Sequence, residues 1–184
     1  MTSILTVCTG NICRSPAAAI ALQGYLGDIA QLSSAGVAAL VDEGLPIAMS
    51  LALEEHGLDG RGHHARMLTP RIVDDSDLII AMTAEHRRRI VSESPRALKR
   101  SFLYMELVAA ARAGAPLPGD TPAERVANIA PAIQAYRPYL AGQDIPDVPD
   151  PYRRPQEVYD EVATMIVAGA GDIAAWVRPE DDGR

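Results

Sequence analysis

The chain has 184 residues, 48% of them hydrophobic, which is typical of one globular domain with its own core. Its formal net charge of −7 argues against nucleic acid as a main partner, and the basic stretches 87–89 and 96–100 are typical of solvated helix faces. We find no basic leader followed by an apolar run, no apolar stretch of membrane-spanning length, and two cysteines typical of free thiols, so we expect a cytoplasmic protein with no membrane span.

The N-terminal residues predict a strand, a loop and a helix in that order. Residues 3–7 are mostly apolar and rich in β-formers, as in a buried strand. Residues 16–27 start with proline and an alanine-rich run, which is typical of a helix whose first turn tolerates the missing amide. The loop 8–15 therefore lies between the end of a strand and the start of a helix, and a second short strand is expected at 31–34.

The residue types of this loop suit the binding and attack of a phosphate group. Amide groups in a strand-to-helix turn and the positive end of the helix favour an anion there, and the same field favours the thiolate form of Cys8. Arg14 can bind two phosphate oxygens with its planar guanidinium group. Gly10 and Asn11 tolerate a positive φ, and Ser15 can donate a hydrogen bond to the sulfur. The loop therefore indicates cysteine-based phosphoryl transfer.

The remainder of the chain alternates helices and strands, which predicts a parallel α/β sheet. Helices are expected at 46–56, 69–73 and 83–92, and strands at 77–82 and 99–103. Residues 107–113 and 122–140 are expected to be helical, with a turn-rich connector between them. A closing helix starts at 152 or 156 and ends at 177, with Gly169 and Gly171 weakening its middle.

Residues 145–152 supply a carboxylic acid on a second loop, as phosphate ester cleavage requires for its leaving oxygen. Asp150 stands between two prolines, which stiffen its backbone and lower the entropy cost of positioning the acid. On spacing alone, Asp144 and Asp147 compete for this role, and the plain alternative is a rigid acidic linker.

The two cysteines at 8 and 13 resemble half of a metal site by spacing, but the chain has no second cysteine pair and no histidine near them in sequence. We therefore predict neither a metal nor a cofactor.

Five motifs in chain order resemble those of the low-molecular-weight protein-tyrosine phosphatases. They are Cys8-Thr9-Gly10-Asn11-Ile12-Cys13-Arg14-Ser15-Pro16, Ser34-Ala35-Gly36, His63-His64-Ala65-Arg66, Asp77 to Met82, and Asp150-Pro151-Tyr152. The resemblance covers most of the chain. It implies a single-domain three-layer α/β sandwich with a central four-stranded parallel sheet flanked by helices, and a phosphate-binding loop after the first strand. The domain is expected to span 1–178, with a helical insertion at about 106–142 and a polar tail at 179–184.

The resemblance also implies roles for individual residues. Cys8 is the nucleophile, Arg14 binds the phosphate, and Asp150 is the general acid with Asp147 as its neighbour. Substrate and phosphate are expected to contact Thr9, Gly10, Asn11, Ile12, Cys13, Ser15, Leu40 and Tyr152. The supporting hydrogen-bond network is expected to include Ser34 and His63, with His63 preferred to His64. His56 and His86 are typical of surface histidines.

Two positions depart from the family's pattern. Leu40 stands where members often carry tryptophan, and Arg153 follows Tyr152 where many carry a second aromatic residue. We therefore expect weaker stacking of an aryl ring, and a preference of Arg153 and Arg154 for acidic residues next to the phosphorylated one.

The predicted function is hydrolysis of a phosphotyrosine protein or a small aryl phosphate through a phosphocysteine, with release of inorganic phosphate. The alternative is an arsenate reductase that uses an external small thiol, since no cysteine after Cys13 can act as a resolving residue. A phosphate-binding module without catalysis would require loss of Cys8, Arg14 or Asp150, and all three are present. The paired loop cysteines resemble those associated in the family with redox control, so we predict a reversible disulfide between Cys8 and Cys13 under oxidation. The alternative is that Cys13 only packs as a small apolar residue at the start of the helix. The sequence does not predict the oligomeric state.

Overall fold

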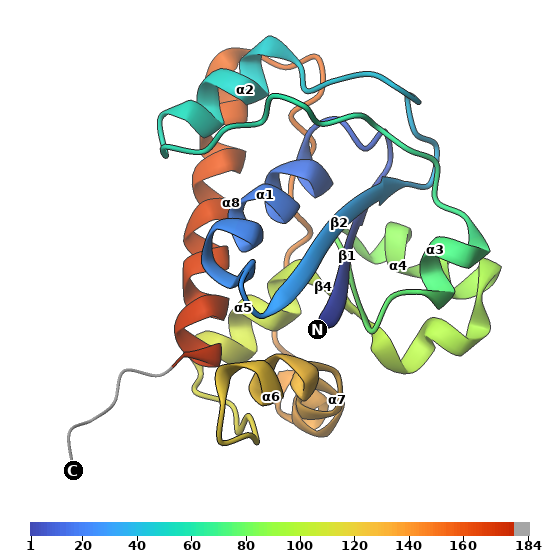
Figure 1. Ribbon diagram of the computed structural model, residues 1–184, viewed down its shortest axis with the longest axis vertical. Coiled ribbons are helices and arrows are strands. Elements are labelled where there is room, and N and C mark those ends of the chain that lie inside the picture. Colours follow the sequence, from blue (N-terminus) through green and yellow to red (C-terminus); the bar gives the residue numbers. More distant parts are fainter. Residues whose placement is uncertain (179–184) are drawn as a thin grey trace.

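A four-stranded parallel sheet lies between two layers of helices in the computed structural model, which describes residues 1–178 (Figure 1). Its strands are β1 (Thr2–Cys8), β2 (Ala30–Gly36), β3 (Leu78–Ala81) and β4 (Ser101–Leu103), in the order β2-β1-β3-β4. The predicted fold class, a single α/β domain with a four-stranded parallel sheet, is confirmed. The predicted polar tail at 179–184 lies outside the described residues.

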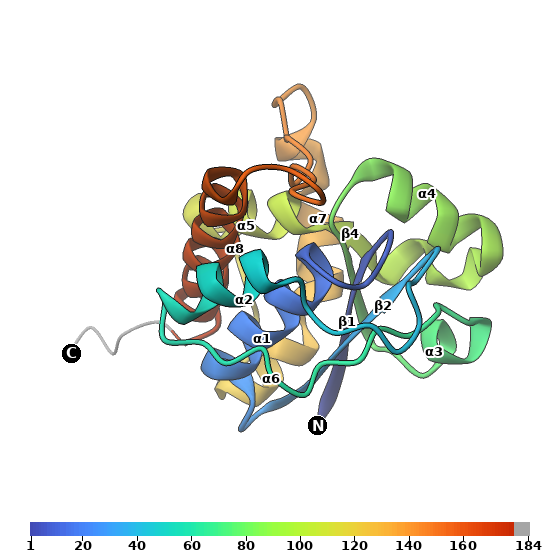
Figure 2. The same cartoon turned by 90° about the horizontal axis from the view of Figure 1, so that it is seen from above.

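The helices cover the two faces of the sheet unequally. On one face lie α1 (Arg14–Leu26), α2 (Ile47–Glu54), α5 (Tyr104–Arg112) and α8 (Gln156–Val177). The other face carries the shorter α3 (Pro70–Asp74) and α4 (Ala84–Glu93), as the view in Figure 2 shows. The remaining elements are the 3₁₀-helix η1 (Pro95–Arg100) and the α-helices α6 (Pro122–Ala127) and α7 (Ile129–Leu140).

Side chains of β1 alternate between the two cores that this arrangement creates. Ile4 packs in the large core beneath α1 and α8, whereas Leu5 and Val7 pack in the smaller core that Val73 and Ile90 of α3 and α4 complete. Strand β1 is a central parallel strand that is buried on both faces, which explains why residues 3–7 are mostly apolar.

Some boundaries differ from prediction for local reasons. Helix α1 begins at Arg14 rather than Pro16, so the arginine belongs to the first helical turn. The single helix predicted at 122–140 is divided at Asn128, whose backbone leaves the helical region (φ −94°, ψ 2°) and whose side-chain amide donates to the carbonyl of Pro118 at 3.1 Å.

Gly169 does not interrupt α8, which is continuous from Gln156 to Val177. A Cβ atom at this position would lie 2.8 Å from Val108 and 2.9 Å from the Tyr104 ring. The glycine therefore permits the close approach of α5 to α8, and that it weakens the middle of the closing helix stays a prediction.

The segment 106–142 forms most of α5 together with α6 and α7, and its helices pack against the rest of the domain. Arg137 of α7 lies 5.0 Å from the centre of the Phe102 ring and 3.4 Å from the Glu106 carboxylate. That this segment is an insertion stays a prediction.

Candidate active site

The loop from Cys8 to Arg14 joins the carboxyl end of β1 to the first turn of α1. The hydroxyl group of Ser15 donates to Cys8 Sγ at 2.9 Å, and both residues are buried. Asn11 adopts the left-handed conformation with φ 55°, as predicted for this position, whereas Gly10 does not have a positive φ. The loop therefore curls around the thiol, with a helix N-terminus beneath it.

The side chain of Asn11 connects this loop to its surroundings. Its amide nitrogen donates to Ser15 Oγ at 3.0 Å and to Ser34 Oγ at 2.9 Å. Its amide oxygen accepts from the backbone amide of Arg66 at 2.9 Å. His63 Nε2 donates to the backbone carbonyl of Asn11 at 2.6 Å, because a carbonyl oxygen can only accept. Ser34 and His63, the residues predicted for the supporting network, thus both form hydrogen bonds with Asn11.

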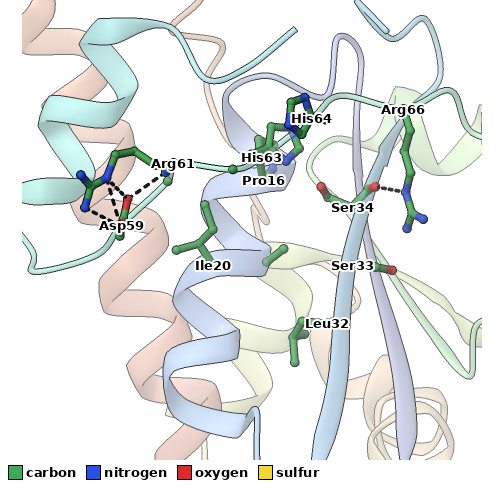
Figure 3. Close-up of a pocket in the computed structure, with 13 residues that line it drawn as sticks. Pro16, Ile20, Leu32, Ser33, Ser34, Asp59, Arg61, His63, His64 and Arg66 are labelled. Carbon is green, nitrogen blue, oxygen red and sulfur yellow. Dashed lines mark hydrogen bonds and ion pairs between the residues drawn. The ribbon is translucent and has the colours of Figure 1, made fainter. Parts of the chain in front are cut away.

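A cavity of about 490 Å³ lies between α1, the edge strand β2 and residues 59–66, and Figure 3 shows the residues that line it. His63 and Ser34 line it together with Arg66, whose Nε donates to the Ser34 carbonyl at 2.8 Å. Burial lowers the pKa of His63, which favours the neutral ring in this position. His64, the less favoured histidine of the motif, lines the same cavity.

Gly36, the last residue of β2, allows the loop to approach the sheet edge. A Cβ atom on this residue would lie 2.4 Å from the carbonyl oxygen of Thr9 and 3.0 Å from the backbone nitrogen of Asn11. The motif Ser34-Ala35-Gly36 therefore has a steric meaning that its spacing alone did not indicate.

Asp150 reaches the loop from the opposite side. Its Oδ2 lies 2.8 Å from Arg14 Nη2, and the two side chains are 53% and 6% exposed. Asp147 instead accepts from the backbone amide of Ala84 at 2.7 Å and so caps the N-terminus of α4. Asp144, the third candidate acid, is exposed in the preceding turn. Geometry favours Asp150 among the three.

The acid loop is attached to the end of β3 by its backbone. The amide of Val148 donates to the carbonyl of Met82 at 2.9 Å, and its carbonyl accepts from Arg14 Nη1 at 3.4 Å. Asp150 is therefore mounted on a segment tied both to the sheet and to the arginine of the phosphate loop.

The two loops enclose a pocket of about 310 Å³. It is lined by Cys8, Thr9, Gly10, Ile12, Cys13, Arg14, Ala38, Leu40, Asp150, Tyr152 and Arg153. The Arg153 guanidinium group lies 5.1 Å from the centre of the Tyr152 ring. The predicted wall residues Leu40 and Tyr152 thus lie on one pocket with Cys8, and Arg153 adds positive charge at its rim.

His86 is not a surface residue, so that prediction is wrong. It is only 4% exposed, with Nε2 2.9 Å from Thr9 Oγ1 and Nδ1 2.9 Å from Thr83 Oγ1. Burial and then the nearby charge of Arg14 lower its pKa to about 4. Thr83, the N-cap of α4, marks in the sequence where this helix starts. The three arginines that follow His86 led to the wrong prediction, because they are typical of a solvated helix face. His56, by contrast, is exposed as predicted.

Cys8 and Cys13 are both free thiols. Burial and the proximity of Cys8 raise the pKa of Cys13 to about 12, so its thiol stays protonated at neutral pH. A disulfide between the two under oxidation stays a prediction. Residues 1–178 contain no group of three histidine, cysteine or acidic side chains placed to hold a metal ion. The same residues form no helix with the length and apolar character needed to cross a membrane.

Comparison with known proteins gives a matching family, similar sequences and similar solved structures. The model of the low molecular weight phosphotyrosine protein phosphatase family matches residues 3–123. The low molecular weight protein-tyrosine-phosphatase Wzb of Escherichia coli K12 is 31% identical over 179 residues, which covers 97% of each chain. The solved structure of Wzb from Escherichia coli K30 with sulphate has a TM-score of 0.70 at 27% identity, and covers 94% of this chain and 95% of that one. The YwlE arginine phosphatase from Geobacillus stearothermophilus has a TM-score of 0.73 at 25% identity, and covers 98% of this chain and 95% of that one.

We predict that Gly36→Ala impairs the loop without unfolding the domain. The added methyl group overlaps the Thr9 carbonyl, so the loop must shift, and binding of inorganic phosphate should weaken about tenfold or more. Calorimetric titration measures the affinity. Gly171→Ala in α8 is the matched control, because its methyl group would meet only the Tyr25 side chain at ordinary contact distance, 3.6 Å or more. Equal affinities in the two variants would contradict the steric role of Gly36.

We further predict that His86 makes folding stability depend on pH below neutrality. Its pKa falls from 6.5 to about 4 on folding, so between these values the unfolded chain binds more protons than the folded one. The contribution of His86 to the free energy of unfolding should therefore be greatest above pH 6.5 and decrease as the pH falls toward 4. Urea unfolding across this range should show a shallower decrease for His86→Asn, whereas the exposed His56→Asn should follow the wild type. His63 shifts stability in the same direction in all three proteins. Parallel curves for wild type and His86→Asn would exclude this contribution.

Proposed function

Because the chain belongs to the low molecular weight phosphotyrosine protein phosphatase family, we propose that it hydrolyses phosphotyrosine in proteins, or small aryl phosphates, through a phosphocysteine intermediate. The observation that carries the proposal is the placement of Cys8, Arg14 and Asp150 on one pocket from two separate loops.

Phosphate binding would use the loop amides and Arg14. The Nε atom of Arg14 is buried and has no hydrogen-bond partner among residues 1–178, although a buried guanidinium donor normally has one. A phosphate oxygen in the pocket would satisfy it. The positive end of α1 supports the same anion, since Arg14 begins that helix.

In the first step, the Cys8 thiolate attacks phosphorus, the P–S bond forms and the P–O bond to the aryl group breaks. The leaving oxygen takes the proton of Asp150. In the second step, water attacks phosphorus and gives a proton back to Asp150, while the P–S bond breaks and inorganic phosphate leaves. The Ser15 hydroxyl group at 2.9 Å stabilises the sulfur anion that attacks and later departs.

Asp150 suits the acid role because it is half-exposed at the rim while Arg14 lies buried beneath it. A bound phosphate competes with the Asp150 carboxyl group for Arg14, which frees that group to face the leaving oxygen. The family match ends at residue 123, so this assignment is supported by the geometry of the acid loop and not by the matched range.

The pocket walls support an aryl substrate, since Leu40 and Tyr152 offer apolar surface to a ring. Some structural neighbours are arginine phosphatases. Arsenate resembles phosphate and would fit the same loop. Purified protein should therefore be assayed on a phosphotyrosine peptide, a phosphoarginine peptide, an alkyl phosphate, and arsenate with a small thiol. Preferential turnover of the phosphotyrosine peptide supports the proposal. Preferential turnover of the phosphoarginine peptide, the alkyl phosphate or arsenate contradicts it.

Cys8→Ser should lower the turnover of an aryl phosphate by more than about a hundredfold, because a serine hydroxyl group stays protonated where a thiolate forms. Inorganic phosphate should still bind, which calorimetry checks. Residual activity above about one per cent of wild type would count against Cys8 as the nucleophile.

Asp150→Asn should slow poor leaving groups more than good ones. A phenol with a pKa of about 10 needs a proton to leave, so the expected loss on phenyl phosphate is roughly 10²–10⁴-fold, and the loss on a nitrophenyl ester is much smaller. The matched variant is Asp147→Asn, whose amide oxygen can still accept from Ala84 and cap α4. It should affect both substrates equally. The opposite pattern would transfer the acid role to Asp147.

A further inference from the structure

Thr9 and Thr83 bind the two ring nitrogens of one buried histidine. Thr9 belongs to the phosphate loop, Thr83 precedes α4, and His86 lies between them in the first turn of α4. The two contacts are each 2.9 Å long. The mechanism above uses none of these three side chains, although Thr9 lines the substrate pocket beside Cys8 and Arg14.

The burial of the two threonines assigns a direction to each hydrogen bond. Thr83 Oγ1 accepts from the backbone amide of His86 at 3.2 Å, as a helix N-cap, and a hydroxyl oxygen can accept a second hydrogen bond. Thr83 is half-buried, and its hydroxyl proton has His86 Nδ1 as its acceptor within residues 1–178, whereas Thr9 is exposed and can donate into the pocket. The tautomer that gives the less exposed hydroxyl proton a partner carries the ring proton on Nε2, which donates to Thr9 Oγ1. Burial keeps the ring neutral near pH 7, since it lowers the pKa of His86 to about 4.

This arrangement leaves the hydroxyl proton of Thr9 without an acceptor among residues 1–178. The Thr9 oxygen accepts from His86, so its own proton must donate elsewhere. Thr9 is exposed and borders the pocket in which the proposed mechanism places the phosphate. Of the charged groups that act on the histidine, Arg14, Asp147 and Asp150 lie at or beside this site, and Glu85 lies on α4 itself.

We propose that the Thr9 hydroxyl group donates a hydrogen bond to a phosphoryl oxygen of the substrate, and that His86 is the positioning residue that turns this proton toward the pocket. The proposal rests on the proposed function, because it assumes that a phosphoryl group occupies the pocket. It adds a side-chain donor to the loop amides and Arg14, and it gives the first turn of α4 a part in substrate binding.

The alternative is that His86 only ties α4 to the loop, and a double-mutant cycle separates the two. Thr9→Val removes the hydroxyl group but keeps the shape, and Thr9→Ser keeps the donor. His86→Asn retains an amide near the Nδ1 position for Thr83 but cannot reach Thr9. His56→Asn is the matched control, because His56 makes a similar contact of 3.2 Å to Thr164 on the surface.

Calorimetric titration with inorganic phosphate measures binding directly, and aryl phosphate kinetics add kcat and KM. Thr9→Val and His86→Asn should each weaken phosphate binding by about tenfold, the usual loss for one hydrogen bond to a charged group. Thr9→Ser and His56→Asn should bind as wild type does. The double variant should bind no more weakly than Thr9→Val alone, because His86 acts through Thr9.

Wild-type affinity in Thr9→Val overturns the proposal, and so do independent losses that multiply in the double variant. If His86→Asn fails to fold, the comparison of Thr9→Val with Thr9→Ser still decides whether the hydroxyl group binds phosphate. A wild-type protein that binds phosphate but hydrolyses no aryl phosphate refutes the proposed function only, since the binding cycle does not depend on turnover.

Discussion

The phosphate loop depends on the buried side chain of Asn11 more than on any other contact. Its backbone has the strained value φ 55°, which the loop needs in order to curl around an anion. Its amide group holds that curl through bonds to Ser15, Ser34 and the Arg66 backbone. Because Ser15 in turn donates to the Cys8 sulfur, the same set of bonds fixes both the shape of the loop and the position of the proposed nucleophile. Few side chains other than asparagine offer this left-handed tolerance together with a donor and an acceptor.

The sheet order explains why residues so distant in sequence meet. Strand β3 neighbours β1, so the carboxyl end of β3 lies beside the phosphate loop. The acid loop attaches there through Met82 and Ala84, and Thr9 attaches there through His86. The first turn of α4 is thus a common support for both halves of the site.

The sequence predicted the sheet, most of the helices and the residues around Cys8, because these follow from apolar periodicity and from motifs with a defined spacing. It failed where tertiary contacts decide. Nothing local distinguishes His86 from an exposed helical histidine, since its partner Thr9 is distant in sequence. Nothing local indicated that Gly169 lies against Tyr104 of α5, where a side chain would have no room. Spacing also left three acids open, which are separated by the ion pair of Asp150 with Arg14, the place of Asp150 on the pocket, and the bond of Asp147 to Ala84.

Arg14 holds both ends of the short segment that carries the proposed acid, through the Val148 carbonyl and the Asp150 carboxylate. A lysine at this position carries its donors on a single nitrogen, in place of the separate Nη1 and Nη2 atoms that make these two contacts while Nε is left for a phosphate oxygen. Arg14→Lys is therefore not a clean probe of substrate affinity. The rate loss of such a variant would combine a weaker grip on the substrate with a detached proton donor, and the two defects can be separated only by comparing leaving groups within that variant.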